Sequence, residues 1–191
     1  MRRVNCLALC TSFLFFAPAI AQEKSKEPAL IELAGGKLVM KAPAEWKVEK
    51  PKSNIVQYEF SAPADAKETD EKVRITVMGA GGGVEANLQR WYGQLSQPSG
   101  KPTKDVAKLE VMDVAGQKIH FVDVTGTFAD TMGAGPFSGK PAVKRENYRM
   151  LGAIVETEKL GMYFVKATGP NDACEKLVEG FKKMLKGLEA K

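Results

Sequence analysis

The segment from Lys72 to Leu95, KVRITVMGAGGGVEANLQRWYGQL, contains the two patterns from which the fold class is inferred. Its first part alternates apolar and polar residues, with Val73, Ile75 and Val77 on one side, and this alternation predicts a half-buried β-strand. A helix is predicted after the glycine run, and the breaking residues at 98–100 are expected to end it. The residues expected on its buried face are Val84, Leu88, Trp91, Tyr92 and Leu95.

Further strand patterns lie on both sides of this segment. The predicted strands cover residues 38–40, 55–60, 73–77, 109–114, 118–128, 148–155 and 162–167. Turn residues at 114–117 and 158–161 leave short connections between consecutive strands. Strands joined in this way are expected to pair antiparallel.

The chain ends with a second predicted helix. Gly169 and Pro170 interrupt the preceding strand, and Asn171 or Asp172 is expected to cap the helix. Its apolar face is expected to consist of Cys174, Leu177, Val178, Phe181, Leu185 and Leu188. The predicted fold class is therefore α+β, a single-domain antiparallel sheet covered by two helices.

Residues 1–21 have the features of a secretory signal peptide. Arg2 and Arg3 precede an apolar run, and Ala19 and Ala21 provide the small residues that signal peptidase recognises. Residues 22–28 are expected to form a flexible leader and residues 29–191 a single domain. The protein is therefore expected to be exported, to the periplasm or beyond. No later apolar run has the length of a membrane span.

The composition argues against several classes of function. Loss of Arg2 and Arg3 with the signal would lower the formal net charge of +5 by two, and the remaining lysines are scattered among glutamates, which is not typical of a nucleic-acid-binding protein. Cys174 would be the single cysteine left, so no intramolecular disulfide is expected. His120 is the one histidine, and no metal site or cofactor is predicted.

The glycine run at 79–83 has two interpretations. A strand, a glycine run and a helix N-terminus can together bind an anion through backbone N–H groups. However, Val84 occupies the position of the last glycine in a dinucleotide fingerprint, and no phosphate-loop lysine follows. A flexible connection in which glycine relieves crowding is the interpretation we favour.

The residues after the glycine run also carry a family resemblance. Gly81-Gly82-Gly83, Asn87, Arg90-Trp91 and Gln94 form a pattern that resembles one in exported bacterial proteins of unknown function. The order of predicted elements resembles the fold shared by Mog1 and the photosystem subunit PsbP. This resemblance extends over roughly the whole chain after the signal and implies an adaptor or binding module. It implies no catalytic residue.

Two groups of residues are candidates for ligand binding. Asn87, Arg90, Trp91 and Gln94 share one face of the first predicted helix, and they could bind an anionic or carbonyl-bearing ligand. Alternatively, these side chains tie the helix to neighbouring loops. The second candidate is a long loop at 125–143 with a basic cluster that follows it. From this cluster we take Arg145 and Arg149 as ligand-binding residues, although an ordinary exposed hairpin connection is equally economical.

Catalytic groups are not evident. Asp123 lies three residues after His120, so the two are expected on opposite faces of one strand. Cys174 is expected to be buried, and Asp123 is expected to pair with a basic residue of a neighbouring strand. We therefore predict an exported, non-catalytic binding or adaptor domain for a protein partner or a small anionic ligand. The alternatives are a hydrolase or isomerase that uses strand carboxylates with Arg90 or Arg149, and a structural component of the envelope.

Overall fold

The computed structural model describes residues 27–66, 71–131 and 141–191, so the predicted signal peptide lies outside the described residues. The upstream elements are β1 (Leu30–Leu33), a 3₁₀ turn η1 (Ala34–Gly36), β2 (Leu38–Lys41), β3 (Lys47–Glu49), β4 (Tyr58–Ala62), β5 (Val73–Ala80), α1 (Val84–Tyr92) and β6 (Leu95–Ser96). The downstream elements are α2 (Thr103–Val106), β7 (Lys108–Val114), β8 (Gln117–Asp130), β9 (Val143–Glu156), β10 (Met162–Pro170), α3 (Asn171–Glu175), α4 (Val178–Lys186) and β11 (Glu189–Ala190).

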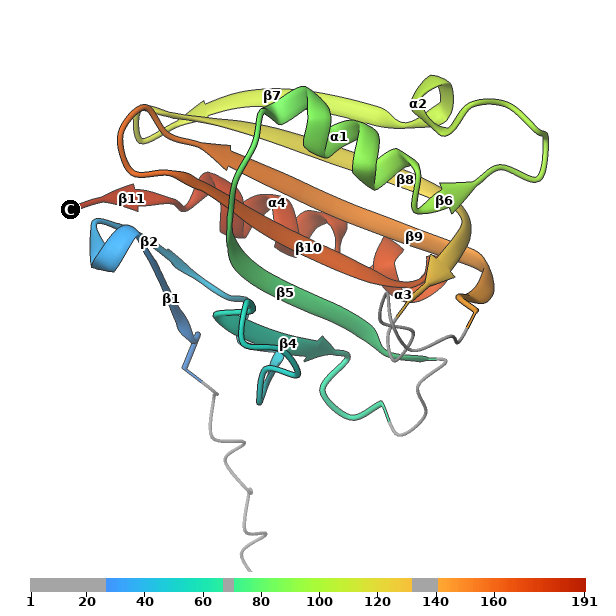
Figure 1. The fold of residues 1–191 in the computed structure, drawn as a ribbon. Helices are drawn as coiled ribbons and strands as arrows, with labels where there is room; N and C mark the ends of the chain where they lie inside the picture. The colour runs from blue at the N-terminus through green and yellow to red at the C-terminus, as the bar shows by residue number, and fades with distance from the viewer. Residues whose placement is uncertain (1–26, 67–70, 132–140) are drawn as a thin grey trace, which may run out of the picture.

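An eight-stranded antiparallel sheet forms the centre of the fold. Its strands follow the order β3-β4-β5-β10-β9-β8-β6, and β7 also pairs with β8. The α+β class with an antiparallel sheet is therefore confirmed (Figure 1). The sequence did not predict the second sheet, in which the short strands β1 and β11 pair with the two sides of β2.

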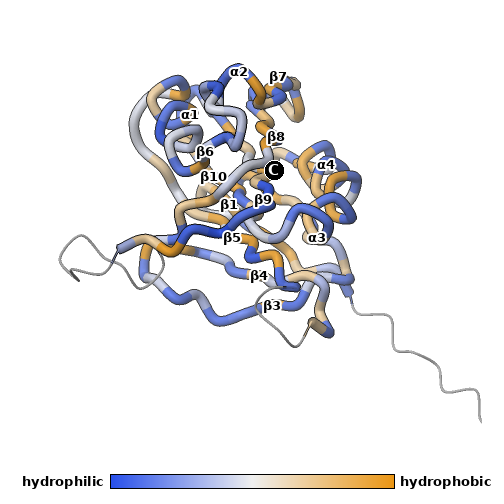
Figure 2. The backbone as a smooth tube through the Cα atoms, turned by 90° about the vertical axis from the view of Figure 1, so that its right-hand side faces the viewer, coloured by the Kyte–Doolittle hydropathy of each residue, from blue (hydrophilic) through white to orange (hydrophobic). Residues whose placement is uncertain are grey.

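The two faces of the large sheet are covered by different elements. The α4 face carries the larger apolar core, in which Phe181 of α4 contacts Phe121 of the sheet and Trp46 of the loop before β3. On the α1 face, Leu88 and Trp91 pack on the β8–β9 half of the sheet. Figure 2 shows α1 and α4 on opposite sides of the sheet. Each predicted helix thus covers its own face.

The two predicted helices and the predicted loop at 125–143 differ from the structure in their bounds. The first helix ends at Tyr92 rather than near 98–100, because Leu95 pairs with Phe128 as part of β6. The last helix is divided into α3 and α4. The predicted loop at 125–143 is wrong at its ends, because β8 continues to Asp130 and β9 begins at Val143; residues 132–140 lie outside the described part.

The turn predicted at 114–117 is confirmed. Ala115 and Gly116 both have positive φ angles, 51° and 73°, which is the backbone of a two-residue hairpin turn between β7 and β8. In the part of the chain that the structure describes, no helix is long and apolar enough to cross a membrane.

Candidate functional site

The helix α1 covers only part of the α1 face of the sheet. A cavity of about 510 Å³ lies on the uncovered part of this face. We call it the basic cavity, because basic side chains outnumber acidic ones in its lining. The basic residues are Lys50, Lys52, Lys72, Arg74, Arg145 and Lys166. The acidic residues are Glu49, Glu59 and Asp130. Its lining also contains apolar groups, Met78, Phe128 and Tyr148 among them.

The alternation of two paired strands provides the floor of the basic cavity. Lys166 of β10 is directly opposite Thr76 of β5, and Thr168 is opposite Arg74. Since side chains alternate between faces along a strand, all four lie on the α1 face. Arg74 and Lys166 are diagonal neighbours across the two strands, a relationship within reach of long side chains. The strand pairing therefore brings two cations together.

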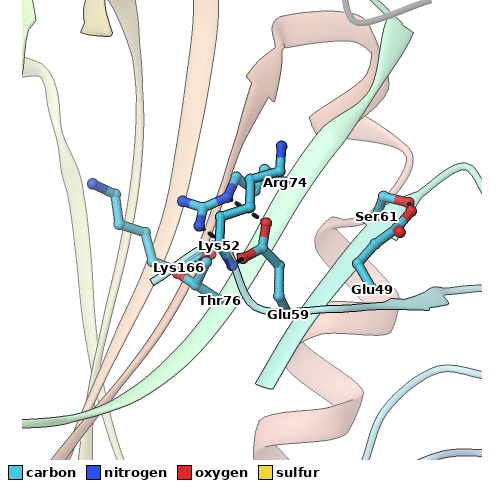
Figure 3. A network of polar contacts seen from close by, with 7 residues as sticks. All are labelled: Glu49, Lys52, Glu59, Ser61, Arg74, Thr76 and Lys166. Atoms are coloured by element: carbon cyan, nitrogen blue, oxygen red, sulfur yellow. Dashed lines mark hydrogen bonds and ion pairs between the residues drawn. The ribbon is translucent and has the colours of Figure 1, made fainter. Parts of the chain in front are cut away.

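One of these cations has a carboxylate partner. Arg74 donates from Nε and Nη2 to the two carboxylate oxygens of Glu59, at 2.7 and 2.9 Å. The backbone N–H of Lys52 donates to the same carboxylate at 3.0 Å (Figure 3). Burial raises the pKa of Glu59, but the hydrogen bonds from Arg74 and Lys52 outweigh it and hold the pKa below its ordinary value. Glu59 is therefore a fixed carboxylate that orients Arg74.

The second cation has no such partner. The Lys166 amine donates a hydrogen bond to Oε1 of Gln94 and lies 5.6 Å from the centre of the Phe128 ring. Among the described residues, no carboxylate forms an ion pair with Lys166. Burial, assisted by the nearby charge of Arg74, lowers the pKa of Lys166 to about 8. A protonated Lys166 is therefore poorly compensated by the protein alone.

An aromatic wall borders the floor. Phe128 of β8 and Tyr148 of β9 stack with an interplanar angle of 5° and a centroid separation of 6.1 Å. The Arg145 guanidinium lies 6.0 Å from the Tyr148 ring centre and pairs with Asp130 at 3.2 Å. A planar or apolar group in the cavity would meet these rings beside the cationic floor.

Local backbone contacts fix the position of Gln94 beside this wall. Its carbonyl oxygen accepts a hydrogen bond of 2.9 Å from the backbone N–H of Ala129. The neighbouring strand approaches so closely that a Cβ atom on Gly126 would lie 2.7 Å from the carbonyl oxygen of Ser96. The short pairing of β6 with β8 thus delivers the Gln94 amide to the Lys166 amine.

The outer edge of the cavity carries a second carboxylate. Glu49 accepts a hydrogen bond of 2.7 Å from the Ser61 hydroxyl and pairs with Lys47 at 3.3 Å. The hydrogen bonds from Ser61 and Lys47 lower the pKa of Glu49. Like Glu59, this carboxylate already has partners within the protein.

The structure divides the six ligand-binding residues predicted from the sequence among four locations. Gln94 and Arg145 line the basic cavity. Asn87 and Arg90 both lie on α1, Arg90 in its last turn, and neither lines the cavity. The Asn87 amide donates to the carbonyl oxygens of Gly81 and Gly83, both at 3.0 Å, and Arg90 donates to the Asn87 amide oxygen at 2.9 Å. This is the geometry of the structural alternative, in which the helix is tied to the glycine run.

Trp91 packs on the α1 face of the sheet, and it does not line the basic cavity. Its ring meets Phe164 edge-on at 5.0 Å. It lies against the backbone of Gly152, where a Cβ atom would be 2.5 Å from the indole ring. Together with Leu88, Trp91 thus packs α1 on the sheet.

Arg149 lies on the opposite face of the sheet. It donates from Nε and Nη2 to both carboxylate oxygens of Asp123, each at 2.7 Å, and it also pairs with Glu175 of α3. The expected pairing of Asp123 with a basic residue on a neighbouring strand is therefore confirmed. Cys174 is buried beside this pair, and burial raises the pKa of its thiol to about 12, which leaves it protonated at neutral pH.

His120 has a partner that the sequence analysis did not identify. Its Nε2 atom lies 2.9 Å from a carboxylate oxygen of Glu156 on β9, and neither residue lines the basic cavity. In the described ranges, no group of three or more His, Cys, Asp or Glu side chains is arranged to hold a metal ion.

Sequence analysis missed Arg74 and Lys166 as candidates. Both occupy the polar positions of alternating strands, and such positions ordinarily face solvent. The available signal was Lys72 and Arg74 on one side of 72–77 and Lys166 as the single charged residue of 162–167. The two residues can be recognised as neighbours only when the pairing of the strands in the sheet is known.

Comparisons with known proteins give a likeness in fold. No protein-family model and no curated protein matches the sequence. The solution structure of cyanobacterial PsbP from Synechocystis sp. PCC 6803 is similar, with a TM-score of 0.48 and 12% identity over 87% of this chain and 94% of that one. LpqN of Mycobacterium tuberculosis, described as involved in cell envelope biogenesis, matches with a TM-score of 0.48 and 10% identity over 80% and 82% of the two chains. The chain resembles PsbP in fold, in agreement with the resemblance seen in the sequence, and at these identities the likeness concerns the fold alone.

Proposed function

We propose that the protein is an exported, non-catalytic binding domain whose basic cavity holds a small organic anion. The observation that carries this proposal is the pair of diagonal cations on the cavity floor, Arg74 and Lys166, of which Lys166 has no carboxylate partner among the described residues. Like charges held close together on a partly desolvated surface oppose folding unless a counterion joins them.

The remaining donors indicate how an anion would be held. Glu59 occupies two of the five N–H donors of Arg74, and the others have no hydrogen-bond partner in the described part of the protein. A carboxylate that accepts hydrogen bonds from Arg74 and Lys166 would complete the hydrogen bonding of both side chains and balance their charge. Charge-assisted hydrogen bonds of this kind are stronger than neutral ones.

The aromatic wall favours an organic anion over a bare inorganic one. The rings of Phe128 and Tyr148, which stack on each other, provide aromatic surface, and Met78 adds a flexible apolar group. Pockets for small molecules characteristically combine an apolar lining with a few placed polar groups. The volume of about 510 Å³ is in the range of such pockets.

The carboxylates support binding rather than hydrolysis or isomerisation. Asp123 is paired with Arg149 on the opposite face, and Glu59 is held by Arg74 and Lys52 with a lowered pKa. A general base or acid works best with a pKa near the operating pH, which a carboxylate held in this way does not have. Among the described residues Arg90 forms no ion pair with a carboxylate, and its hydrogen-bond partner is Asn87.

Benzoate and benzamide provide a matched pair of probes, since they differ in charge and share the phenyl ring. We expect benzoate to bind the purified protein in isothermal titration calorimetry and benzamide to bind about tenfold more weakly or not at all. The Lys166→Met variant should lose about tenfold in benzoate affinity. The Lys182→Met variant, altered on the opposite face, should bind like the wild type. Equal binding of both probes, or unchanged binding by a folded Lys166→Met variant, would exclude the proposed site.

Export is tested separately. The intact mass of the protein recovered from outside the cytoplasm should correspond to a chain that begins at Gln22, because Ala19 and Ala21 form the predicted recognition pattern for signal peptidase. A mass that begins at Met1 would contradict cleavage, and recovery of the protein only in the cytoplasm would contradict export.

A further inference from the structure

We infer that Lys166 is a nucleophilic amine that captures the carbonyl group of a bound oxo acid as a reversible imine. The inference rests on the proposed function and names its ligand class, 2-oxo carboxylates. The basic cavity would then hold its ligand by one covalent bond in addition to the contacts with the carboxylate. No turnover is implied, because the same imine is hydrolysed when the ligand leaves.

The position of the amine is the first step of the argument. Lys166 lines the cavity and lies over Phe128, and its Nζ donates to a neutral amide oxygen, that of Gln94. Lys182 offers a direct contrast, since its amine also lies over a ring, that of Phe121 at 4.9 Å, but pairs with Glu110. A carboxylate partner stabilises the ammonium form, which has no lone pair for attack. The structure thus provides one lysine suited to nucleophilic attack and one that is not.

The protonation state agrees with this geometry. With its pKa lowered to about 8, about a tenth of Lys166 is the free amine at pH 7. Desolvation and a neighbouring cation are the two means by which proteins activate lysine for imine formation with carbonyl compounds. Both are present here, the second as Arg74.

The position of Arg74 selects oxo acids among carbonyl compounds. A carboxylate bound to the donors of Arg74 that Glu59 leaves unused would lie beside Lys166, because the two residues are diagonal neighbours. In a 2-oxo acid the carbonyl carbon is bonded directly to the carboxylate carbon. Binding of the carboxylate to Arg74 would therefore place the carbonyl group of the oxo acid next to the Lys166 amine.

The reaction is balanced without a co-reactant. The lone pair of the neutral Nζ attacks the carbonyl carbon, a C–N bond forms, and a proton moves from nitrogen to oxygen to give a carbinolamine. Departure of that oxygen as water leaves a C=N bond, and no atom changes its oxidation level overall. Protonation of the imine restores one positive charge next to the bound carboxylate.

Pyruvate with sodium cyanoborohydride, which reduces the imine to a stable secondary amine, tests this inference on the purified wild-type protein. Peptide mass mapping should find a carboxyethyl group on Lys166, formed about tenfold or more faster than on Lys182. Benzoate should slow the modification of Lys166 and leave that of Lys182 unchanged. The Lys166→Arg variant should lose the fast modification, whereas the Lys182→Arg variant should keep it.

The outcomes separate the inference from the function on which it rests. If benzoate binds the wild type but Lys166 reacts no faster than Lys182, the imine is excluded and anion binding stands. If benzoate does not bind, the proposed function fails irrespective of trapping. Persistence of the fast modification in a folded Lys166→Arg variant would assign it to another lysine and would also overturn the inference. Circular dichroism and thermal melting of each variant establish that it is folded.

Discussion

Arg149 of β9 and Asp123 of β8 form a bidentate ion pair, with both N–O distances at 2.7 Å and each residue 8% exposed. Removing one partner of a buried pair leaves the other charge uncompensated, which typically costs about 3–5 kcal/mol. We expect the Arg149→Met variant to lose stability in this range, measured as the free energy of unfolding in urea. The Asp123 pair is thus predicted to act in stability rather than in ligand binding.

The Arg90→Met variant is the control for this prediction. Arg90 was an equal candidate for ligand binding in the sequence, but it is exposed and its described contact is one hydrogen bond to Asn87. Its replacement should change the free energy of unfolding by no more than about 1 kcal/mol. Similar losses in the two variants would show that the buried pair has no special energetic role.

Trp91 and Gly152 form a second specific contact with a measurable consequence. Because a Cβ atom at position 152 would lie 2.5 Å from the indole ring, Gly152→Ala should displace α1 from the sheet or distort the strand. Overpacking of this kind costs about 1–3 kcal/mol. The midpoint of urea unfolding should fall accordingly, and the near-ultraviolet circular dichroism of tryptophan should change.

The matched control for Gly152 is Gly81→Ala. A Cβ atom on Gly81 would have no heavy atom within 4 Å, and its φ angle is not in the left-handed region. We expect a change within about 0.5 kcal/mol. Equal destabilisation by the two substitutions would attribute the effect to loss of glycine flexibility rather than to the contact with Trp91.

The antiparallel sheet was predictable because its signals are local. Alternation in 73–77 and the turn at Ala115 and Gly116 need no knowledge of distant residues. The end of α1 was not predictable, since it depends on Leu95 pairing with Phe128, which is 33 positions further along the chain. The short strands β1 and β11 were missed for the same reason, because each forms only by pairing with β2.

The candidate site was predictable only in part. Gln94 was identified on the polar face of the first predicted helix and Arg145 in the basic cluster after the predicted loop, and both line the basic cavity. Arg74 and Lys166 carry the cation pair, but each is an ordinary polar position of its own strand. Sequence order does not say that β5 and β10 are neighbours, because 81 residues separate the end of one from the start of the other. Non-local pairing is what creates the site.

Glu59 should make the protein sensitive to acid. Its pKa is lower in the folded state than in the unfolded chain, so its contribution to stability is fully present above the unfolded value and is lost as the pH falls through the folded one. We expect the wild type to be more stable than the Glu59→Gln variant at pH 7 and to lose that advantage below about pH 4. Urea unfolding of both proteins at a series of pH values measures the difference. A difference that stays constant down to the lowest pH would contradict the assigned role of Glu59.

Anion binding by the basic cavity should weaken as the pH rises. The free protein holds Lys166 with a pKa of about 8, and a bound carboxylate stabilises its ammonium form. Binding is therefore coupled to proton uptake by Lys166, and the affinity for benzoate should fall once the pH exceeds about 8, by up to about tenfold per pH unit. Calorimetric titrations between about pH 6 and pH 10, a range that brackets this pKa, would follow the fall. Benzoate stays anionic throughout, so the change reports on the protein.

The Lys166→Met variant has no amine to titrate and should bind benzoate weakly with a flat profile, whereas the Lys182→Met variant should retain the wild-type fall. A wild-type affinity that is independent of pH, or a fall that persists in Lys166→Met, would show that another group controls the binding.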